Sequence, residues 1–438
     1  MESLRAEPLT AGNGSAPSWA GWSRRLAARL DSQSIAHYFQ LMAGTLGRLL
    51  LQAGYFFILV NALSLSGMGA FASASAIGLM LASFSGLGFG SLSFRAAAGH
   101  SRLLGHYLAM TYVFMIVALP LGLLAALPVY FLLFKSAMPL AAFLGIIAVE
   151  IFAWRGIEFI QQINAGQGKF AIASLVITLG AAARTLAALG FALWGNGSVE
   201  QWALFYVISN FAAAALLWIL YRPRTPLRWR ARLFRARIAD SIAFALSYFS
   251  FSAQSQLDKV IVLSLTDARL AGIYAIATRI IDFTTVPFRN FYVLYCRKLI
   301  AEVRPANLVR RGLVVEAIIA VASTLGFAAL IGVLWLWPNL LGAHVAEASS
   351  FFALLLAVPA FKNLLEFHGE LFFITGRMTA RAAIAFGLIA LNASALAILL
   401  IASKNIIQLG LWLNAIYAGL YLLSAVAVYR FVTARSRP

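Results

Sequence analysis

The chain has few charged residues. Asp, Glu, Lys and Arg make up 11% of its 438 residues, whereas a soluble globular protein has about 25%. Hydrophobic residues make up 62% of the chain. This balance excludes an ordinary soluble domain and predicts a protein that lies within a lipid bilayer.

Cysteine and histidine are also scarce. A single cysteine, Cys296, excludes an intramolecular disulfide. The five histidines show no metal-ligand spacing, and the sequence around His368, Glu-Phe-His-Gly-Glu, does not fit a zinc-protease helix. We therefore expect no metal site.

Sequence signatures of nucleotide-driven and enzymatic proteins are missing. Gly168-Lys169 resembles part of a phosphate-binding loop, but Ile163 and Phe170 stand where that loop needs its first glycine and its final hydroxyl. Every predicted outer loop has about ten residues or fewer, which leaves no room for an extramembrane catalytic domain. We therefore predict that the chain is not an enzyme and that it binds no nucleotide or other cofactor.

Long apolar runs are abundant. A helix needs about 20 apolar residues to cross roughly 30 Å of hydrocarbon. Twelve stretches meet this length, with ends uncertain by a few residues, and they predict an all-α polytopic protein: 38–62, 69–92, 106–133, 139–163, 171–194, 202–221, 241–264, 271–295, 312–337, 348–373, 382–402 and 407–430.

The basic residues alternate between successive loops. Lys and Arg are retained on the cytoplasmic side of short loops. With the N-terminus inside, the cytoplasmic segments hold 24 basic residues, against Lys135, Arg269 and Lys404 outside. The net charge of +19 therefore reflects membrane topology, and it does not indicate a nucleic-acid partner. Both termini are predicted to be cytoplasmic.

These features divide the chain into five parts. The first lacks the apolar core of a cleavable signal, although Trp19–Leu30 could form an amphipathic surface helix. The basic linker is expected to bind anionic lipid head groups. The parts are an N-terminal cytoplasmic segment (1–35), a six-helix lobe (36–221), the linker (222–239), a second six-helix lobe (240–431) and a cytoplasmic tail (432–438).

Two short patterns occur once in each half. Gly69-Ala-Phe-Ala-Ser-Ala-Ser reappears as Gly272-Ile-Tyr-Ala-Ile-Ala-Thr, and Glu158-Phe reappears as Glu366-Phe, each followed by an inner-face Gly-Lys or Gly-Arg. Both copies run in the same direction through the membrane. The repeat predicts two parallel helical bundles that face each other, with a pathway between them.

Fourteen charged residues fall inside the predicted spans, where each costs about 2.5–3.5 kcal/mol if it faces lipid. Local pairing explains some of them, because residues three or four apart share a helix face. Arg155 with Glu158 and Arg279 with Asp282 have this spacing. Lys362, Glu366 and Glu370 form a polar stripe on one helix, which Pro359 is expected to bend.

Several cations have no acidic partner within one helical turn. They are Arg48, Arg184 and Arg289. For Arg48 and Arg279, near the middle of their spans, lining of a cavity competes with pairing between helices, and the two alternatives are equally balanced for Arg184. Arg289 and Lys259 lie nearer the span ends, where snorkelling to the surface is the common explanation.

The intramembrane acids are candidates for binding a coupling ion. Glu158 and Glu366 stand out because the repeat matches them, and each could instead tether a helix end to a basic loop. Glu370 is a comparable candidate, and Asp258 and Asp282 complete the set. A proton and a sodium ion are the two candidate ions.

The second predicted span is rich in glycine. Gly69, Gly78, Gly86, Gly88 and Gly90 fall within it. Small residues let helices approach closely, so packing is the first interpretation. A bending gate helix is the alternative.

The segments Gln256-Leu-Asp-Lys-Val-Ile-Val-Leu-Ser-Leu and Gly272-Ile-Tyr-Ala-Ile-Ala-Thr-Arg279 resemble a helix hairpin of the bacterial oligosaccharide flippases. These proteins form the polysaccharide-exporting branch of the multidrug/oligosaccharidyl-lipid/polysaccharide exporter superfamily. The resemblance covers residues from about 35 to 432. Twelve spans, where many relatives have fourteen, argue against the lipid II exporter subgroup.

The resemblance implies two pseudo-two-fold-related six-helix lobes around a central cavity that opens alternately to either side of the bacterial inner membrane. The implied cargo is a polyprenyl-pyrophosphate-linked oligosaccharide, moved outward for envelope or exopolysaccharide synthesis. A polysaccharide polymerase and glycosyltransferases are candidate partners. The implied cationic cavity would draw on Arg48, Arg279, Arg184, Arg289 and Lys362. A cation-coupled multidrug antiporter and a non-transporting scaffold are the alternatives.

Overall fold

A computed structural model of the protein describes residues 32–434, apart from 100, 303–304, 375–377 and 404. All regular elements of the described residues are helices. Those of the first half are α2 (Ser32–Ala62), α3 (Leu65–Ala82), η1 (Ser85–Gly88), α4 (Phe89–Gly99), α5 (Ser101–Val129), η2 (Tyr130–Phe134), α6 (Leu140–Ala148), η3 (Val149–Trp154), α7 (Arg155–Gly166), α8 (Phe170–Trp194) and α9 (Val199–Tyr221).

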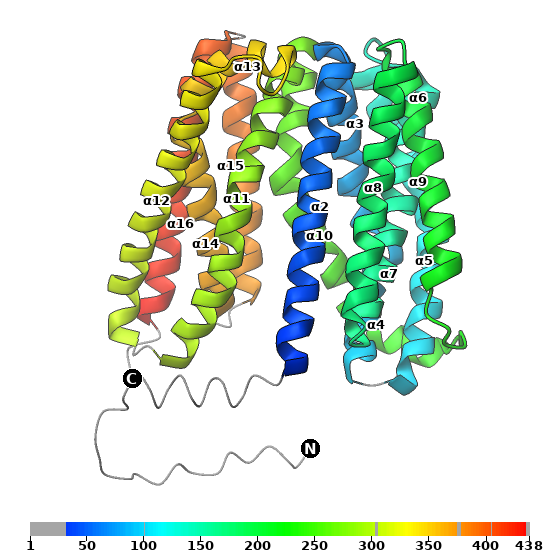
Figure 1. The fold of residues 1–438 in the computed structure, drawn as a ribbon. Coiled ribbons are helices and arrows are strands. Elements are labelled where there is room, and N and C mark those ends of the chain that lie inside the picture. Colours follow the sequence, from blue (N-terminus) through cyan, green and yellow to red (C-terminus); the bar gives the residue numbers. More distant parts are fainter. Residues whose placement is uncertain (1–31, 100, 303–304, 375–377, 404, 435–438) are drawn as a thin grey trace.

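The second half continues the same architecture. Figure 1 shows its helices standing beside those of the first half, with α2 starting and α16 ending at the same, lower side. The elements are α10 (Ala231–Leu265), α11 (Ala268–Glu302), α12 (Pro305–Leu336), α13 (Ala343–Leu354), α14 (Val358–Ile374), α15 (Met378–Ala402) and α16 (Ile406–Ala434). Each of the twelve predicted spans coincides with one helix or with a run of consecutive helices.

The helices are those of a multi-pass membrane protein. Within the described residues, eight are long and apolar enough to cross a bilayer, or nine if α13 and α14 count as one bent span. The predicted spans at 241–264 and 271–295 form α10 and α11 but fall outside this set. Ser, Gln and charged side chains lower the hydropathy of α10, and Thr, Asn and charged side chains lower that of α11.

The second predicted span is broken. α3 ends at Ala82, and Gly86, Leu87 and Gly88 adopt positive φ angles before α4 begins. Glycine suits this left-handed backbone because it has no Cβ. A Cβ at Gly88 would overlap with the backbone of Ser241 in α10. The prediction of one continuous helix at 69–92 was therefore wrong, and the glycines serve both a break and a close contact.

Two other predicted spans are distorted. The span at 139–163 contains a π-helical segment, Val149–Trp154, between α6 and α7. Such segments are rare and are frequent at functional sites. The span at 348–373 bends by 72° between α13 and α14. The bend expected from Pro359 is confirmed, because this proline lies in the first turn of α14, where its missing N–H costs nothing.

The two repeated glycines meet each other. Gly69 of α3 lies against the backbone of α11, where a methyl group would overlap with the carbonyl oxygen of Ala268 and lie 2.6 Å from the amide nitrogen of Gly272. A methyl group at Gly272 would in turn overlap with the carbonyl oxygen of Leu65. The two copies of the repeat therefore contact each other closely at these two glycines.

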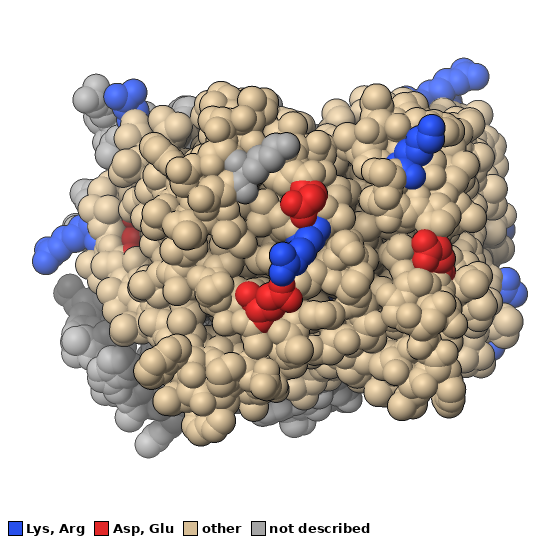
Figure 2. All heavy atoms as spheres, turned by 90° about the horizontal axis from the view of Figure 1, so that it is seen from above, with Lys and Arg blue, Asp and Glu red and all other residues tan. Residues whose placement is uncertain are grey.

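Further contacts join the halves at the upper end of Figure 1. Asn61, at the end of α2, donates to the carbonyl oxygen of Leu341 at 2.9 Å, and Nδ1 of His344 lies 2.7 Å from the carbonyl oxygen of Val60. At the same end, but within the second half, Arg269 of α11 forms an ion pair with Glu347 of α13. Figure 2 looks onto this end and shows a largely uncharged face with scattered acidic and basic side chains.

Candidate substrate and ion-binding site

Three of the predicted cavity cations lie close enough to interact. Arg48 comes from α2, Arg184 from α8 and Arg279 from α11, and the charges of the other two act on Arg48. The ring of Trp154 lies under two of them: the guanidinium carbon of Arg184 is 3.7 Å from its centroid and that of Arg48 is 5.9 Å away. Helices from both halves of the chain thus contribute to one cationic region.

Arg184 is held by a buried carboxylate. Its Nη2 lies 3.4 Å from Oε2 of Glu150, and its Nε donates to Oδ1 of Asn210 at 2.8 Å. Glu150 is 1% exposed and also accepts hydrogen bonds from Ser75 at 2.8 Å and Tyr206 at 2.6 Å. Of the alternatives for Arg184, the structure shows pairing between helices.

The sequence interpretation missed Glu150. The residue lies in the π-helical segment Val149–Trp154, far along the chain from Arg184. One signal was available, since Glu150 is an acidic residue inside an otherwise apolar run. A partner on another helix cannot be identified from spacing.

Arg48 and Arg279 have no such partner. Among the described residues, neither has a carboxylate oxygen within ion-pair distance, and both are partly exposed. Arg279 lies over the ring of Phe283, 5.5 Å from its centroid. The predicted pair of Arg279 with Asp282 was wrong, because Lys362 of α14 pairs with Asp282 instead.

A second local pair is present. Arg155 and Glu158 are 3.0 Å apart, as their spacing predicted, and Nε1 of Trp154 also donates to Glu158 at 3.1 Å. The guanidinium of Arg155 lies 5.0 Å from the ring centroid of Tyr248, on α10. Glu158 acts on Arg48 through its charge without forming an ion pair with it.

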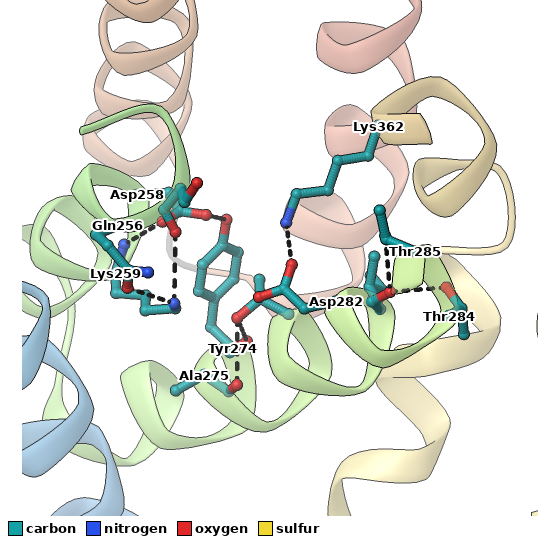
Figure 3. A network of polar contacts seen from close by, with 12 residues as sticks. Gln256, Asp258, Lys259, Tyr274, Ala275, Asp282, Thr284, Thr285 and Lys362 are labelled. Carbon is teal, nitrogen blue, oxygen red and sulfur yellow. Dashed lines mark hydrogen bonds and ion pairs between the residues drawn. The ribbon is translucent and has the colours of Figure 1, made fainter. Parts of the chain in front are cut away.

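The second half carries its own polar network, shown in Figure 3. Lys362 donates to Asp282 at 2.7 Å, which joins α14 to α11. Nearby, Asp258 accepts a hydrogen bond from Tyr274 at 2.8 Å. Lys259 is only 7% exposed, and its ammonium group donates to Gln256 at 2.8 Å. Lys259 was expected to snorkel to a surface, but these partners hold it inside the protein.

A small cavity of about 50 Å³ lies beside this network. Its polar lining includes Asp258, Lys362, Glu366, Asn392 and Tyr417. The volume is enough for a few water molecules or one small ion. Acids and a cation from different helices therefore meet at one small space.

Two predicted site residues lie outside this arrangement. Glu370 is on α14, partly exposed, and does not line the cavity. Arg289 belongs to α11, but its side chain lies outside the described part of the structure.

Comparison with known families decides the relationship. A family model described as polysaccharide biosynthesis protein matches residues 35–286, which is more than half of the chain. The chain belongs to this family. No curated protein matches it.

Solved structures show the same fold in transporters of one superfamily. The chain is similar to an inward-facing multidrug resistance MATE family transporter of the MOP superfamily, with a TM-score of 0.70, 15% identity, and 89% of this chain and 94% of the other covered. It is also similar to the MATE multidrug transporter DinF-BH, with a TM-score of 0.63, 15% identity, and coverage of 92% and 97%. A third similar structure is a MOP superfamily transporter from Pyrococcus furiosus, with a TM-score of 0.51, 14% identity, and coverage of 91% and 95%.

These findings identify the protein as a multi-pass membrane protein of the polysaccharide biosynthesis family whose fold is that of the MATE transporters. The prediction of an all-α polytopic membrane protein of this family is confirmed.

Proposed function

We propose that the protein moves a polyprenyl-pyrophosphate-linked oligosaccharide from the inner to the outer leaflet of the bacterial cytoplasmic membrane. The observation that supports this cargo is an excess of positive charge around Arg48 and Trp154. The charges of Arg184, Arg279 and Glu158 all act on Arg48. Ion pairs bind Arg184 to Glu150 and Arg155 to Glu158, so Arg48 and Arg279 are the two cations of this region without a carboxylate partner among the described residues.

The chemistry of a diphosphate fits this charge. A polyprenyl-linked pyrophosphate carries roughly two negative charges, and guanidinium groups bind phosphate oxygens with two parallel hydrogen bonds. Arg48 and Arg279 lie against aromatic rings. Stacking uses the flat face of a guanidinium and leaves its N–H edges free for such bonds. These two arginines are therefore the proposed pyrophosphate ligands.

The contacts at the upper end of the molecule support loading from the opposite side. The Gly69–Gly272 contact and the bonds of Asn61 and His344 join the two halves there. We propose that this end faces outward, because its surface bears few charges (Figure 2), whereas the basic linker between α9 and α10 lies at the other end (Figure 1). Alternating access would then require these contacts to separate.

The related structures leave one alternative open. Two of the similar transporters are described as multidrug transporters, whereas the one from Pyrococcus furiosus is described as having a binding pocket of reverse polarity, which suggests a different function. A cation-extruding transporter needs an excess of acidic groups, and the region around Trp154 has the opposite sign. Inward movement of a proton or sodium ion through Glu158, Glu366, Glu370, Asp258 or Asp282 would accompany export of the proposed cargo and would not replace it.

The proposal is tested by replacing Arg48 and Arg279 singly with Ala and with Lys. We expect each Ala variant to lower surface polysaccharide at least tenfold at equal membrane levels, since each loses a ligand for the diphosphate. The Lys variants should keep part of the activity, because they keep the charge but lose the paired hydrogen bonds. Arg269→Ala is the matched control, since Arg269 is an exposed arginine on the same helix as Arg279.

Normal export by both Ala variants would sink the cationic-site proposal. Export of cationic dyes by the native protein, unaffected by these replacements, would favour the multidrug alternative. If replacing all of these cations by neutral residues left surface polysaccharide unchanged, the result would favour a non-transporting scaffold for the polymerase and glycosyltransferases.

A further inference from the structure

A second buried cluster lies in the C-terminal half, away from the cationic region. Glu316 of α12 and His368 of α14 are 3% and 0% exposed, and Nε2 of His368 is 3.0 Å from Oε1 of Glu316. Nδ1 of His368 is 3.0 Å from Oγ of Ser424 on α16. A hydrogen-bonded line Glu316, His368, Ser424 therefore connects three helices.

Two tyrosines of α16 complete the surroundings of Glu316. Tyr421 donates to Oε2 at 2.7 Å, and the hydroxyl of Tyr429 donates to Oε1. Tyr421 also stacks on the imidazole of His368, with 5.4 Å between the ring centroids. Gly312, one turn before Glu316, makes room, because a methyl group there would lie 2.7 Å from the Tyr429 hydroxyl.

The hydrogen-bond pattern leaves one proton undetermined. With Glu316 ionised, its two oxygens accept from Tyr421, Tyr429 and Nε2–H of His368, so all its partners are donors. The Ser424 hydroxyl can either donate to Nδ1 or accept from it. A neutral imidazole therefore leaves the pair with one negative charge, and an added proton at Nδ1 makes the pair neutral overall.

The apolar surroundings of Glu316 and His368 make a net charge on the pair costly. The pair lies beside an apolar cluster that includes Val315, Ile319, Phe367 and Leu371. An uncompensated charge is costly in such a place. We propose that Glu316 and His368 form a proton-binding site of the exporter, in which uptake of one proton at Nδ1 of His368 cancels the charge of Glu316.

Among the described residues, the neighbouring charged groups do not neutralise Glu316 in place of that proton. On the three helices, Arg310, Arg311 and Arg430 are exposed at the inner ends, and Lys362 is bound to Asp282. Glu366 lines the separate small cavity. Among the side chains that the structure describes, the remaining charged and titratable groups of the packed elements are Arg269, Tyr274, Arg279 and Asp282 on α11, Glu370 on α14, Tyr417 on α16, and His344 and Glu347 on α13. Residues 383–402 of α15 contain no charged residue.

The site lies near the inner surface. Glu316 follows Arg311 by five residues, or about 8 Å of helix. Tyr429 is partly exposed and precedes the exposed Arg430. The Tyr429 hydroxyl thus lies between Glu316 and the inner end of α16, so we expect the pair to exchange its proton with the inner side in this conformation.

The repeat shows that the site is confined to one half. The offset that relates Glu158 to Glu366 places Ile160 opposite His368, and Ile160 is buried in an apolar cluster. Residues 108–113, which correspond to Glu316, contain no charged residue. A proton site in one lobe would let protonation change that lobe's packing without affecting its counterpart. This inference deepens the proposed function and rests on it for the role of the proton in export, but not for proton binding itself.

Proton binding is tested on the full chain in lipid nanodiscs, without any cargo. His37, His100, His106 and His344 are replaced by Gln, so that the one ¹⁵N-labelled imidazole left is that of His368. The sample is titrated from about pH 9 to about pH 5, and we expect the ¹⁵N resonances to change from those of a neutral to those of a charged imidazole. Glu316→Gln should move that step by at least about one pH unit, because it removes the negative charge beside the ring.

Ser323→Ala is the matched control for Glu316→Gln. It removes the buried 2.8 Å hydrogen bond from Asn363, which joins the same two helices without a titratable group. This variant should leave the step within about 0.3 pH unit of its native position, because no charge changes. The proposal would be overturned if the imidazole of His368 stayed in one protonation state across that pH range. It would also be overturned if Glu316→Gln did not shift the pH at which the imidazole is protonated.

Coupling is tested in proteoliposomes with lipid-linked oligosaccharide. His368→Gln keeps a donor toward Glu316 but cannot take up a proton. We expect a pH gradient to stimulate the native protein severalfold and to have no effect on this variant, read as the ratio of rates with and without the gradient. Equal ratios would overturn the coupling role. A normal His368 titration combined with normal export by the Arg48 and Arg279 variants would instead refute the proposed cargo site alone.

Discussion

Arg184 and Arg48 illustrate how much a single residue depends on a partner from another helix. Both are arginines inside predicted spans without a local acid. Arg184 is enclosed by Glu150, Asn210 and the rings of Trp154 and Tyr206, whereas Arg48 has the Trp154 ring and no carboxylate partner among the described residues. The first is part of the framework, and the second is available to a ligand.

Glu150→Gln should be strongly destabilising. Removing one partner leaves the buried charge of Arg184 uncompensated, which typically costs about 3–5 kcal/mol. Tyr206→Phe removes only one hydrogen bond to Glu150 and should cost about 1–3 kcal/mol. Equilibrium unfolding in detergent micelles measures both.

The double variant Glu150→Gln with Arg184→Met provides the control, because it removes both charges. It should recover most of the lost stability. A double variant no more stable than Glu150→Gln alone would show that the pair is not the source of the effect.

At the scale of whole helices, glycine decides where α3 breaks and where it meets α11. Gly86 and Gly88 take left-handed backbone angles, while Gly69 lies in regular helix against the backbone of α11. A uniform run of small residues in the sequence therefore has two distinct roles. The packing interpretation applies at Gly69 and Gly88, and the gate helix stays a prediction.

Gly69→Ala and Gly272→Ala should shift the exporter away from the conformation with its upper end closed. Each added methyl group meets backbone atoms that cannot move aside as a flexible side chain could. We expect at least a tenfold loss of export and a longer distance between spin labels at Glu200 and Asn405. Pulsed EPR measures this distance once Cys296 is replaced by Ser.

Gly326→Ala on α12 is the control, because nothing lies within 4 Å of its added methyl group. It should be neutral, or stabilise the helix by up to about 1 kcal/mol. Unchanged distances and export in the Gly69 and Gly272 variants would show that this crossing is not needed for closure.

At the scale of the whole molecule, the proposed anionic cargo would cross a membrane that carries an electrical potential. A membrane potential of 100 mV contributes about 2.3 kcal/mol per elementary charge. A head group with roughly two negative charges would gain about 4–5 kcal/mol on moving outward from a negative interior. This explains how export could proceed without a nucleotide site.

Transport should therefore respond to voltage in the absence of nucleotide. In proteoliposomes with a potassium gradient and valinomycin, a potential negative on the loading side should speed export of lipid-linked oligosaccharide severalfold, and the reversed potential should slow it. Rates that are equal at both polarities would contradict a net movement of negative charge.

The sequence by itself determined the features that depend on composition and on neighbours along the chain. Apolar run length predicted a helix or a run of helices at each of the twelve stretches, because the bilayer thickness fixes how long a crossing helix must be. It did not predict the break after α3, and α10 and α11 fall outside the described helices that are apolar enough to cross. The i, i+3 spacing of Arg155 and Glu158 predicted their ion pair, and Pro359 predicted a bend.

Only the tertiary structure decided which charges meet. Asp282 pairs with Lys362 and not with Arg279, Arg184 pairs with Glu150, and His368 pairs with Glu316, in each case across helices far apart in the sequence. In a bilayer these partners are selected by the cost of a lone charge and by the packing of helices, and neither leaves a local signature. The repeated Gly69 and Gly272 are visible in the sequence, but only the packed helices show that they contact each other.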